Sequence, residues 1–343
     1  MRFEDAWYRD TPSDRALRAA LAPLSWLYGS GVKFRNMLYD REMLSADSAS
    51  VPVISVGNVS VGGTGKTPVT AYIVGALLDS GHRPAVVMRG YGDDEPLLHA
   101  RLNPTVKVYT GARRSLGIAQ AERDGADVVV MDDAFQHRAV ARDLDIALIS
   151  ADRWGDHLHL LPAGPLREPL TSLERADIVV VTRKAADSAS ATSVASALRP
   201  YLGQRTTVVT AAIEPVSLTT FSKRETAPLR SVEDATVLAI AGVGDPDSFF
   251  AQLRRLGGRL TEQRFRDHHA YTARDGEVLA RAGAGHKYVI TTEKDAIKLA
   301  SVWPANAPEL WYLSQAVTLA EGTASVGSAL AKLFVERATS IVG

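Results

Sequence analysis

A glycine-rich loop between an apolar segment and a helical segment places the strongest constraint on the fold of this chain. The sequence VPVISVGNVSVGGTGKTP spans residues 51–68. Its first part predicts a buried strand, and the segment TPVTAYIVGALLDS that begins at Thr67 predicts a helix. Gly62, Gly63 and Gly65 allow the backbone to curl, so that successive amide groups point inward at the positive end of the helix. A strand, a loop and a helix in this order predict a cradle for a polyphosphate.

The last two residues of the loop have side chains suited to phosphate chemistry. In loops of this class a lysine at the place of Lys66 reaches the β- and γ-phosphates, and a hydroxyl at the place of Thr67 binds Mg²⁺. The general pattern has a glycine where this chain has Ser60, so a plain glycine-rich turn is the alternative. The strand before the loop and the helix after it favour the phosphate-binding interpretation. The expected phosphate-binding residues are Gly62, Gly63, Thr64, Gly65, Lys66 and Thr67.

Short apolar runs that alternate with helical patterns indicate an α/β fold. The continuous apolar character of these runs is typical of strands buried on both faces of a parallel, doubly wound sheet. Ligands bind at the C-terminal edge of such a sheet. The expected strands of this P-loop domain are 52–56, 84–88, 106–109, 128–131, 146–149 and 178–182.

The rest of the chain predicts a second, smaller α/β domain joined by a β-type linker. Residues 207–233 combine segments in which apolar and polar residues alternate with a charged stretch, and the residues after them show further strand and helix patterns. The expected strands are 237–241, 288–292 and 311–313, and the expected helices are 246–256, 273–282 and 322–338. The predicted organisation is amphipathic N-terminal helices in 1–45, the P-loop domain in 46–206, the linker in 207–233 and the C-terminal domain in 234–343.

Composition limits the classes of function. The 343 residues and the hydrophobic content of 46% suffice for two domains of average size. Lys and Arg together number 39, as do Asp and Glu, so net charge does not favour nucleic acid as a partner. Because there is no cysteine, disulfides, thiolate metal sites and a cysteine nucleophile are excluded, which fits a cytoplasmic protein. We expect no export signal, and no apolar run near the N-terminus reaches the length of about 20 residues that a spanning helix needs.

The N-terminal segment predicts an amphipathic helix. Thr11, Pro12 and Asp14 form a helix start in which Thr11 is the N-cap. Apolar residues then recur at a spacing of three to four, with basic residues beside them. This face could lie on a membrane surface or pack on the protein's own core, and both interpretations stay open. The apolar residues are Leu17, Leu21, Leu24, Trp26, Leu27, Tyr28, Phe34, Met37, Leu38 and Tyr39.

Acidic residues follow two of the predicted strands. Asp132 and Asp133 end the run VVVMDD, at the place of the Walker-B carboxylate that holds Mg²⁺ opposite the loop hydroxyl. Turn chemistry is the alternative for this pair. The segment Arg89–Pro96 carries three acids at the same edge of the sheet, and one of them could accept a proton from a substrate hydroxyl in a phosphoryl transfer. A solvated acidic turn is the alternative there.

Arginine and histidine residues complete the set of candidates. Four arginines lie near predicted loop edges and are suited to holding a phosphate of a substrate, namely Arg113, Arg114, Arg138 and Arg167. His268 and His269 form the only adjacent histidine pair in the sequence. No third ligand stands at a fixed spacing from them, so zinc is disfavoured. A histidine that orients a carboxylate base across a domain cleft is the favoured interpretation.

Five motifs together resemble the tetraacyldisaccharide 4'-kinase family, the lipid A 4'-kinases of Gram-negative bacteria. The motifs span most of the chain, and the family's loop has the same spacing around Ser60. Three features depart from the family: only Asp93 separates RGYG from DEP, Met88 replaces a usual Ser, and Ala134 replaces a usual Gly. The motifs are GNVSVGGTGKTP at 57–68, RGYG with DEP at 89–96, DDAFQH at 132–137, LPAGPLRE at 161–168, and DHHAYT with TTEKDAIK at 267–272 and 291–298.

The resemblance implies ATP- and Mg²⁺-dependent phosphorylation of the 4'-hydroxyl of a tetraacylated glucosamine disaccharide 1-phosphate. It also implies peripheral attachment to the cytoplasmic face of the inner membrane, with no obligate protein partner, and so favours the membrane interpretation of the N-terminal helix. Asp94 and His268 would form a base dyad, with Asp93 as the alternative base. The other implied roles are nucleotide and Mg²⁺ for Lys66 and Thr67, metal and transferring phosphoryl group for Asp132 and Asp133, and the substrate for Arg113, Gln136, His137, Arg167 and Glu168.

Two other functions are compatible with the sequence. A nucleotide-driven switch or assembly ATPase could use the same loop and sheet, but it would need no base for an acceptor hydroxyl. The DEP and DHH motifs therefore favour a kinase over a switch. A kinase of a soluble sugar would differ from a lipid kinase in the N-terminal segment, because residues 11–41 would then pack internally.

Overall fold

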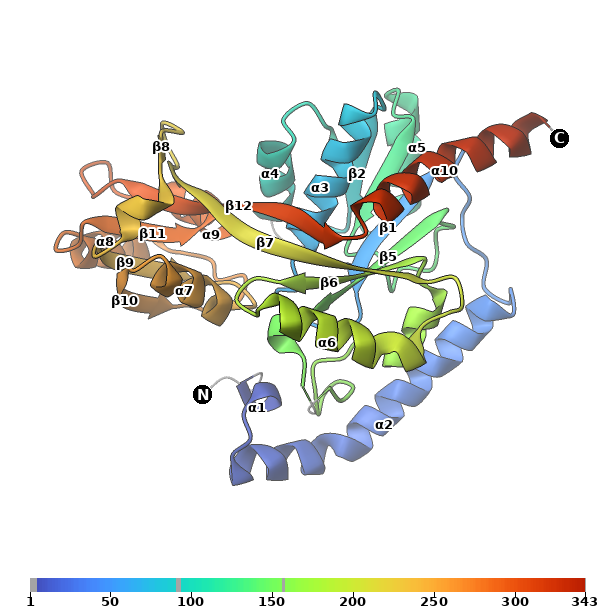
Figure 1. Ribbon diagram of the computed structural model, residues 1–343, viewed down its shortest axis with the longest axis horizontal. Helices are drawn as coiled ribbons and strands as arrows, with labels where there is room; N and C mark the ends of the chain where they lie inside the picture. Colours follow the sequence, from blue (N-terminus) through green and yellow to red (C-terminus); the bar gives the residue numbers. More distant parts are fainter. Residues whose placement is uncertain (1–4, 91–93, 156–157, 343) are drawn as a thin grey trace.

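The protein is described by a computed structural model that covers residues 5–90, 94–155 and 158–342. A mixed sheet of 12 strands runs through the molecule in the order β10-β9-β11-β12-β7-β6-β5-β1-β4-β2-β3, with β8 paired to β7 (Figure 1). The strands are β1 (Val53–Asn58), β2 (Pro84–Met88), β3 (Val108–Thr110), β4 (Val128–Asp132), β5 (Leu144–Ser150), β6 (Ile178–Arg183), β7 (Thr207–Thr220), β8 (Thr226–Ala227), β9 (Thr236–Ala241), β10 (Arg259–Arg264), β11 (Tyr288–Thr292) and β12 (Leu310–Glu321).

Helices connect most of these strands. The α-helices are α1 (Asp5–Tyr8), α2 (Pro12–Asp40), α3 (Lys66–Asp79), α4 (Asp94–Leu102), α5 (Arg114–Arg123), α6 (Ser188–Leu198), α7 (Pro246–Arg255), α8 (Ala273–Gly283), α9 (Glu293–Ala300) and α10 (Thr323–Val342). The short 3₁₀ helices are η1 (Ala151–Arg153), η2 (Leu170–Arg175), η3 (Arg199–Tyr201) and η4 (Leu229–Val232). We call residues 46–206 the larger half and residues 234–309 the smaller half.

Helices cover both faces of the sheet in the larger half. Successive residues of a strand point to opposite faces, so β1 contributes to two apolar clusters. Ile54 and Val56 pack in the cluster that includes residues of α3, whereas Val53 packs in the cluster that includes Ile118 of α5. All six strands of the larger half pair in parallel. This arrangement confirms the predicted doubly wound α/β fold.

Strands β7 and β12 continue the sheet from the larger half into the smaller half. They are 14 and 12 residues long and pair antiparallel from Thr210 to Thr220. We predicted a β-type linker in 207–233, and the single strand β7 occupies residues 207–220 of it. The region expected to be a linker therefore supplies an interior strand of the common sheet. Strand β10 and helix α9 were not predicted from the sequence.

The last helix packs on the larger half. We expected residues 322–338 to close the smaller domain. Val326, Leu330 and Leu333 of α10 are instead buried in the same apolar cluster as Ile54 of β1 and Ile73 of α3. Since β12 runs back toward the larger half, the helix that follows it covers that half (Figure 1).

Helix α2 lies along the outside of the larger half (Figure 1). The Thr11 hydroxyl accepts a hydrogen bond from the Asp14 amide, which confirms the predicted N-cap. Ser25 donates to the carbonyl of Leu160 and accepts from the amide of Ala163, at 2.9 Å and 2.8 Å. These bonds attach the helix to the LPAGPLRE segment. No helix in the described part of the chain is both long enough and apolar enough to cross a membrane.

Candidate active site

The predicted phosphate loop joins β1 to α3. Gly65 is the N-cap of α3 and has a φ of 86°, in the left-handed region. A side chain at Gly65 would also collide with Ile213 of β7. Glycine adopts this backbone conformation at little cost, so both observations explain why the loop requires glycine there. The loop thus places the N-terminus of α3, at Lys66, at the C-terminal edge of the sheet.

Side chains from neighbouring strands fix the loop. Asn58 Nδ2 donates to Thr64 Oγ1, and Thr182 Oγ1 donates to the carbonyl of Thr64, each at 2.8 Å. Lys184 Nζ donates to the carbonyl of Gly63, also at 2.8 Å. The loop is therefore held from β1 and from the end of β6. Lys184 was missed by sequence analysis, because it reaches the loop only through the pairing order of the strands.

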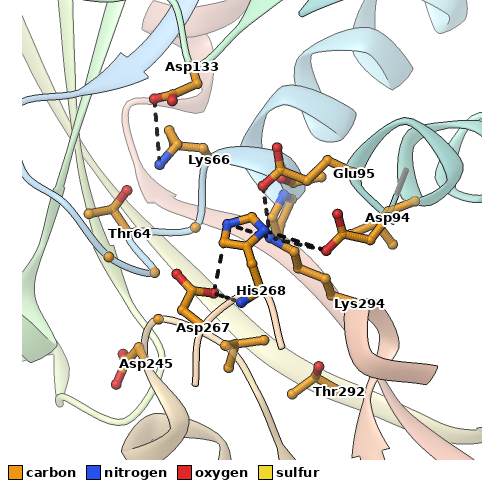
Figure 2. Close-up of a pocket in the computed structure, with 18 of the residues that line it drawn as sticks. Thr64, Lys66, Asp94, Glu95, Asp133, Asp245, Asp267, His268, Thr292 and Lys294 are labelled. Atoms are coloured by element: carbon orange, nitrogen blue, oxygen red, sulfur yellow. Dashed lines mark hydrogen bonds and ion pairs between the residues drawn. The ribbon is translucent and has the colours of Figure 1, made fainter. Parts of the chain in front are cut away.

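Asp133 faces Lys66 at the edge of the sheet. Because β4 pairs in parallel with β1, the residue that follows β4 comes close to the loop. The Asp133 carboxylate lies 3.7 Å from Lys66 Nζ (Figure 2) and 3.0 Å from Arg167 Nη1. Burial raises the pKa of this carboxyl, but Lys66 and Arg167 outweigh burial and lower the pKa to about 2. Asp133 is therefore ionised at neutral pH.

The carboxylate of Asp132 is occupied by other groups of the protein. Thr70 Oγ1 donates to it at 3.1 Å and the Asp133 amide at 2.8 Å, while His99 Nε2 lies 2.8 Å from the second oxygen. Burial raises the pKa of the Asp132 carboxyl, but the contact with His99 lowers it by more than burial raises it. The net shift of the pKa is therefore downward. Of the two acids predicted for the metal, Asp133 lines the cavity and Asp132 does not.

Asp94 and His268 meet across the two halves. Asp94 begins α4 in the larger half, and His268 lies between β10 and α8 in the smaller half. His268 Nδ1 is 3.8 Å from Asp94 Oδ2 (Figure 2). His268 has a φ of 56°, which is costly for a residue other than glycine and is a feature of functional sites. The alternative base, Asp93, lies outside the described residues.

A cavity of about 1630 Å³ contains both ends of this arrangement. Its wall is formed by residues of the two halves and of α2. Thr64, Lys66 and Asp133 lie at one end of the cavity and Asp94 and Glu95 at the other, with His268 between them (Figure 2). The predicted site residues that line the cavity are Gly62, Gly63, Thr64, Gly65, Lys66, Thr67, Asp94, Asp133, Gln136, His137, Arg167 and His268.

Three residues expected near the substrate do not line the cavity. Arg138 pairs instead with Asp40 of α2, at 2.7 Å. Arg113 is exposed as the N-cap of α5, whereas its neighbour Arg114 is buried, lines the cavity and donates to the Asp133 carbonyl at 2.8 Å. Glu168 is buried between Arg35 and Arg175, each at 2.7 Å. Because Arg35 belongs to α2, Glu168 fixes that helix to the larger half. The sequence showed the right motifs here but not which side chain of each faces inward.

Gln136 and His137 line the wall next to Asp133. Gln136 Nε2 donates to the carbonyl of Asn58 at 2.6 Å, which ties this segment to the start of the loop. Burial, together with the nearby Arg114, lowers the pKa of His137 to about 4. The imidazole is therefore neutral at neutral pH. Ala134, at a position where glycine is usual, has no left-handed backbone, so its side chain is accommodated.

Fold and site together define a P-loop phosphotransferase, because a phosphate loop and an ionised acid share one cavity with a carboxylate suited to deprotonate an acceptor. The sequence profile of the tetraacyldisaccharide-1-P 4'-kinase family matches residues 17–334. The chain belongs to this family.

Individual relatives support the same assignment. The tetraacyldisaccharide 4'-kinase of Syntrophotalea carbinolica is 39% identical over 84% of this chain and 85% of its own length. The enzyme of that name from Halorhodospira halophila is 36% identical over 92% of this chain and 93% of its own length. The crystal structure of LpxK from Aquifex aeolicus in complex with ATP superimposes with a TM-score of 0.70 at 30% identity, covering 93% of this chain and 99% of that one.

Proposed function

We propose that this protein transfers the γ-phosphoryl group of ATP to the 4'-hydroxyl of a tetraacylated glucosamine disaccharide 1-phosphate. Family membership supports the reaction. The observation that supports this reaction for the present chain is the cavity. Lys66 and Asp133 line it together with Asp94 and His268. A phosphate donor and a hydroxyl acceptor can therefore be held in one cavity.

At the phosphate end, the loop and its lysine would hold the nucleotide. Backbone amide groups of a loop before a helix bind phosphate oxygens, and the Lys66 ammonium would neutralise charge on the transferring group. Contacts of this kind act mainly by stabilising charge in the transition state. We propose that the base dyad acts on the acceptor rather than on the nucleotide.

The donor groups at this end fit a magnesium ion. Thr67 and Asp133 supply a hydroxyl and a carboxylate oxygen, the hard ligands that Mg²⁺ prefers, and both line the cavity. We propose these two as the ligands. Asp132, which is bonded to Thr70 and His99, would orient Asp133 and its surroundings rather than bind directly. When bound, the ion would neutralise charge on the phosphate oxygens.

At the acceptor end, Asp94 would act as the general base. It would take the proton of the 4'-hydroxyl while the oxygen forms a bond to the γ-phosphorus and the bond from that phosphorus to the β-phosphate oxygen breaks, releasing ADP. His268 would hold Asp94 in position. Arg114, Gln136 and Arg167, which lie beside Asp133, are suited to bind a phosphate group of the substrate, and His137 would contribute neutral hydrogen bonds there.

Helix α2 would place the protein on the cytoplasmic face of the inner membrane. Its apolar residues are largely exposed, with exposed fractions of 79% for Trp26, 68% for Leu27, 58% for Phe34 and 55% for Leu24. An exposed apolar face of this kind, flanked by basic residues, is suited to a lipid surface. It also argues against a kinase of a soluble sugar, for which we expected these residues to pack internally.

A switch or assembly ATPase is not favoured. The curated relatives carry the name of a kinase, and the described chain pairs a buried carboxylate with a histidine where an acceptor hydroxyl would have to lose its proton.

The test is transfer of label from ATP labelled at the γ-phosphate to the acylated disaccharide in detergent micelles. We expect labelled lipid from the wild-type protein, and a turnover lower by about 10² to 10³ in Lys66→Ala, since a lost transition-state contact of this type costs that much. Lys332→Ala, on α10, is the matched control for loss of a lysine. Release of free phosphate with no labelled lipid would instead support the ATPase.

A further inference from the structure

Lys294 contacts three groups at the acceptor end of the cavity. It is the second residue of α9 in the smaller half, two residues after the end of β11. Its Nζ donates to Glu95 Oε1 at 2.8 Å, lies 3.7 Å from Asp94 Oδ2 and approaches His268 Nε2 to 3.5 Å. Figure 2 shows these side chains converging on the Lys294 ammonium. The lysine therefore joins helix α4 of the larger half to the histidine of the smaller half.

An ammonium group constrains the protonation of the ring beside it. Lysine has three N–H donors and no acceptor, so a histidine nitrogen bonded to it has to accept. Burial lowers the pKa of Lys294, but Glu95 and Asp94 outweigh burial and raise it, which keeps the group charged. His268 Nε2 must then carry no proton. In a neutral imidazole the proton is consequently on Nδ1.

Nδ1 is also the ring atom that faces the base. It lies 3.8 Å from Asp94 Oδ2, a buried oxygen that has no hydrogen-bond partner in the described part of the chain. An N–H at this position can donate to the carboxylate once the two groups close up. With the proton on Nε2, a nitrogen lone pair would face the carboxylate and repel it. The tautomer therefore decides whether the pair can act together.

We propose that Lys294 is a positioning residue that fixes the proton of His268 on Nδ1, so that the imidazole N–H faces Asp94. The role of this tautomer in catalysis rests on the proposed function. The position of the proton on the ring does not depend on that function. Asp267 gives the opposite preference, because its Oδ1 lies 3.9 Å from Nε2 and would attract a proton there. Without Lys294 the two carboxylates would compete, because Asp94 Oδ2 lies 3.8 Å from Nδ1. Removing Lys294 should therefore raise the fraction of rings that carry the proton on Nε2.

Lys298 provides a matched control on the same helix. Its Nζ lies 4.0 Å from the same oxygen of Asp94, but its close partner is Asp295 at 2.9 Å. No contact between Lys298 and His268 is present among the described residues. A simple effect of positive charge near Asp94 would appear in Lys298→Met as well as in Lys294→Met. An effect through the ring would appear only in Lys294→Met.

The experiment reads the tautomer directly by NMR of the full chain labelled with ¹⁵N-histidine. The chain has 8 histidines, so His268→Gln identifies the signals of His268. We expect the wild-type protein, Lys294→Arg and Lys298→Met to show a ring protonated on Nδ1, and Lys294→Met to show a clearly increased fraction of rings protonated on Nε2. An Nε2-protonated or doubly protonated ring in the wild-type protein overturns the proposal, and so does an unchanged tautomer in Lys294→Met.

Kinetics give a second readout. Lys294→Met should lower kcat by about 10²-fold, the contribution of a positioned proton acceptor, with the KM for ATP changed by less than about threefold. Lys294→Arg keeps a charged donor and should recover most of kcat. A larger effect on KM than on kcat overturns the positioning role. Because NMR needs no substrate, failure of transfer to the disaccharide would count against the proposed function and leave the tautomer result intact.

Discussion

Positive charge gathers at the phosphate end of the cavity. Lys66 and Arg167 both approach the Asp133 carboxylate, Arg114 donates to its carbonyl, and Lys184 binds the loop at Gly63. Such a cluster favours anionic ligands and disfavours any further protonated group. A histidine at this end of the cavity should therefore stay neutral, and His137 does so at neutral pH.

The lowered pKa of His137 has a consequence for stability. Its pKa of about 4 in the folded protein lies below the value of about 6.5 expected in the unfolded chain. As the pH falls below 6.5 the unfolded chain binds a proton that the folded chain does not, so the free energy of unfolding decreases until the pH reaches about 4. His137→Gln removes this contribution.

We therefore expect His137→Gln to lose less stability than the wild-type protein between pH 7 and pH 5. The difference should be on the order of 1 kcal/mol in the free energy of unfolding, measured in urea at both pH values. His286→Gln, in the smaller half, controls for the loss of a histidine as such. Parallel losses in the wild-type protein and in His137→Gln would show that the pKa of His137 is not lowered.

At the scale of single elements, α2 carries both an exposed apolar surface and part of the cavity wall. Leu24, Trp26, Leu27 and Phe34 are exposed, while Tyr28 and Arg35 line the cavity. Arg35 is fixed by Glu168, and the Tyr28 hydroxyl donates to the carbonyl of Arg167 at 2.9 Å. The helix is thus anchored to the residues that surround the substrate site. Attachment to lipid through α2 would hold that site against the surface.

The double variant Leu24→Asp, Leu27→Asp should release the protein from phospholipid vesicles. Each large apolar side chain contributes about 1.5 to 3 kcal/mol when it is fully buried, so replacing two should weaken partitioning by at least about 100-fold. Leu116→Asp is the matched control, because Leu116 is exposed on α5, away from α2. Vesicle sedimentation measures the change. Undiminished binding of a folded double variant would assign the anchor to another surface.

Elements with a local signature could be predicted from the sequence, and elements defined by distant contacts could not. The loop at 62–67 and Asp133 were predictable because parallel strands bring their C-terminal ends to one edge. The choice between Arg113 and Arg114 was not, since it depends on the residue at which α5 begins. The position of α10 was also not predictable, because an amphipathic helix shows that it packs but not which sheet face it covers.

At the scale of the whole molecule, the proposed base dyad is assembled from two halves. Asp94 comes from α4, and His268 comes from the smaller half, yet the two lie only 3.8 Å apart. The smaller half also reaches the phosphate loop, because Gly244 lies so close to Gly63 that a side chain at Gly244 would collide with it. Arg153 of the larger half holds Gly244 there by donating to its carbonyl at 2.9 Å. Both ends of the cavity therefore depend on the relative position of the halves.

If Asp94 and His268 act as one unit, their substitutions should not be additive. Asp94→Asn preserves the shape of the side chain and removes its basicity, and it should lower kcat more than KM. The double variant Asp94→Asn, His268→Ala should be little worse than the poorer single variant. Steady-state kinetics of the two single variants and the double variant measure this. Losses that multiply would separate the two roles, and an active Asp94→Asn beside an inactive Asp93→Asn would place the base one residue earlier.

Helix α2 would also confine the reaction to the membrane surface. A helix with its side chains is only about 10 to 12 Å across, so the part of the cavity wall that α2 forms and its exposed apolar surface lie within roughly one helix diameter of each other. An acceptor with four acyl chains could then present its sugar to the cavity while those chains stay in the bilayer. Encounter would occur by lateral diffusion in two dimensions, and the relevant concentration would be the surface density of the acceptor. Diluting the acceptor with inert phospholipid should slow turnover, whereas adding buffer around vesicles that carry bound enzyme should not.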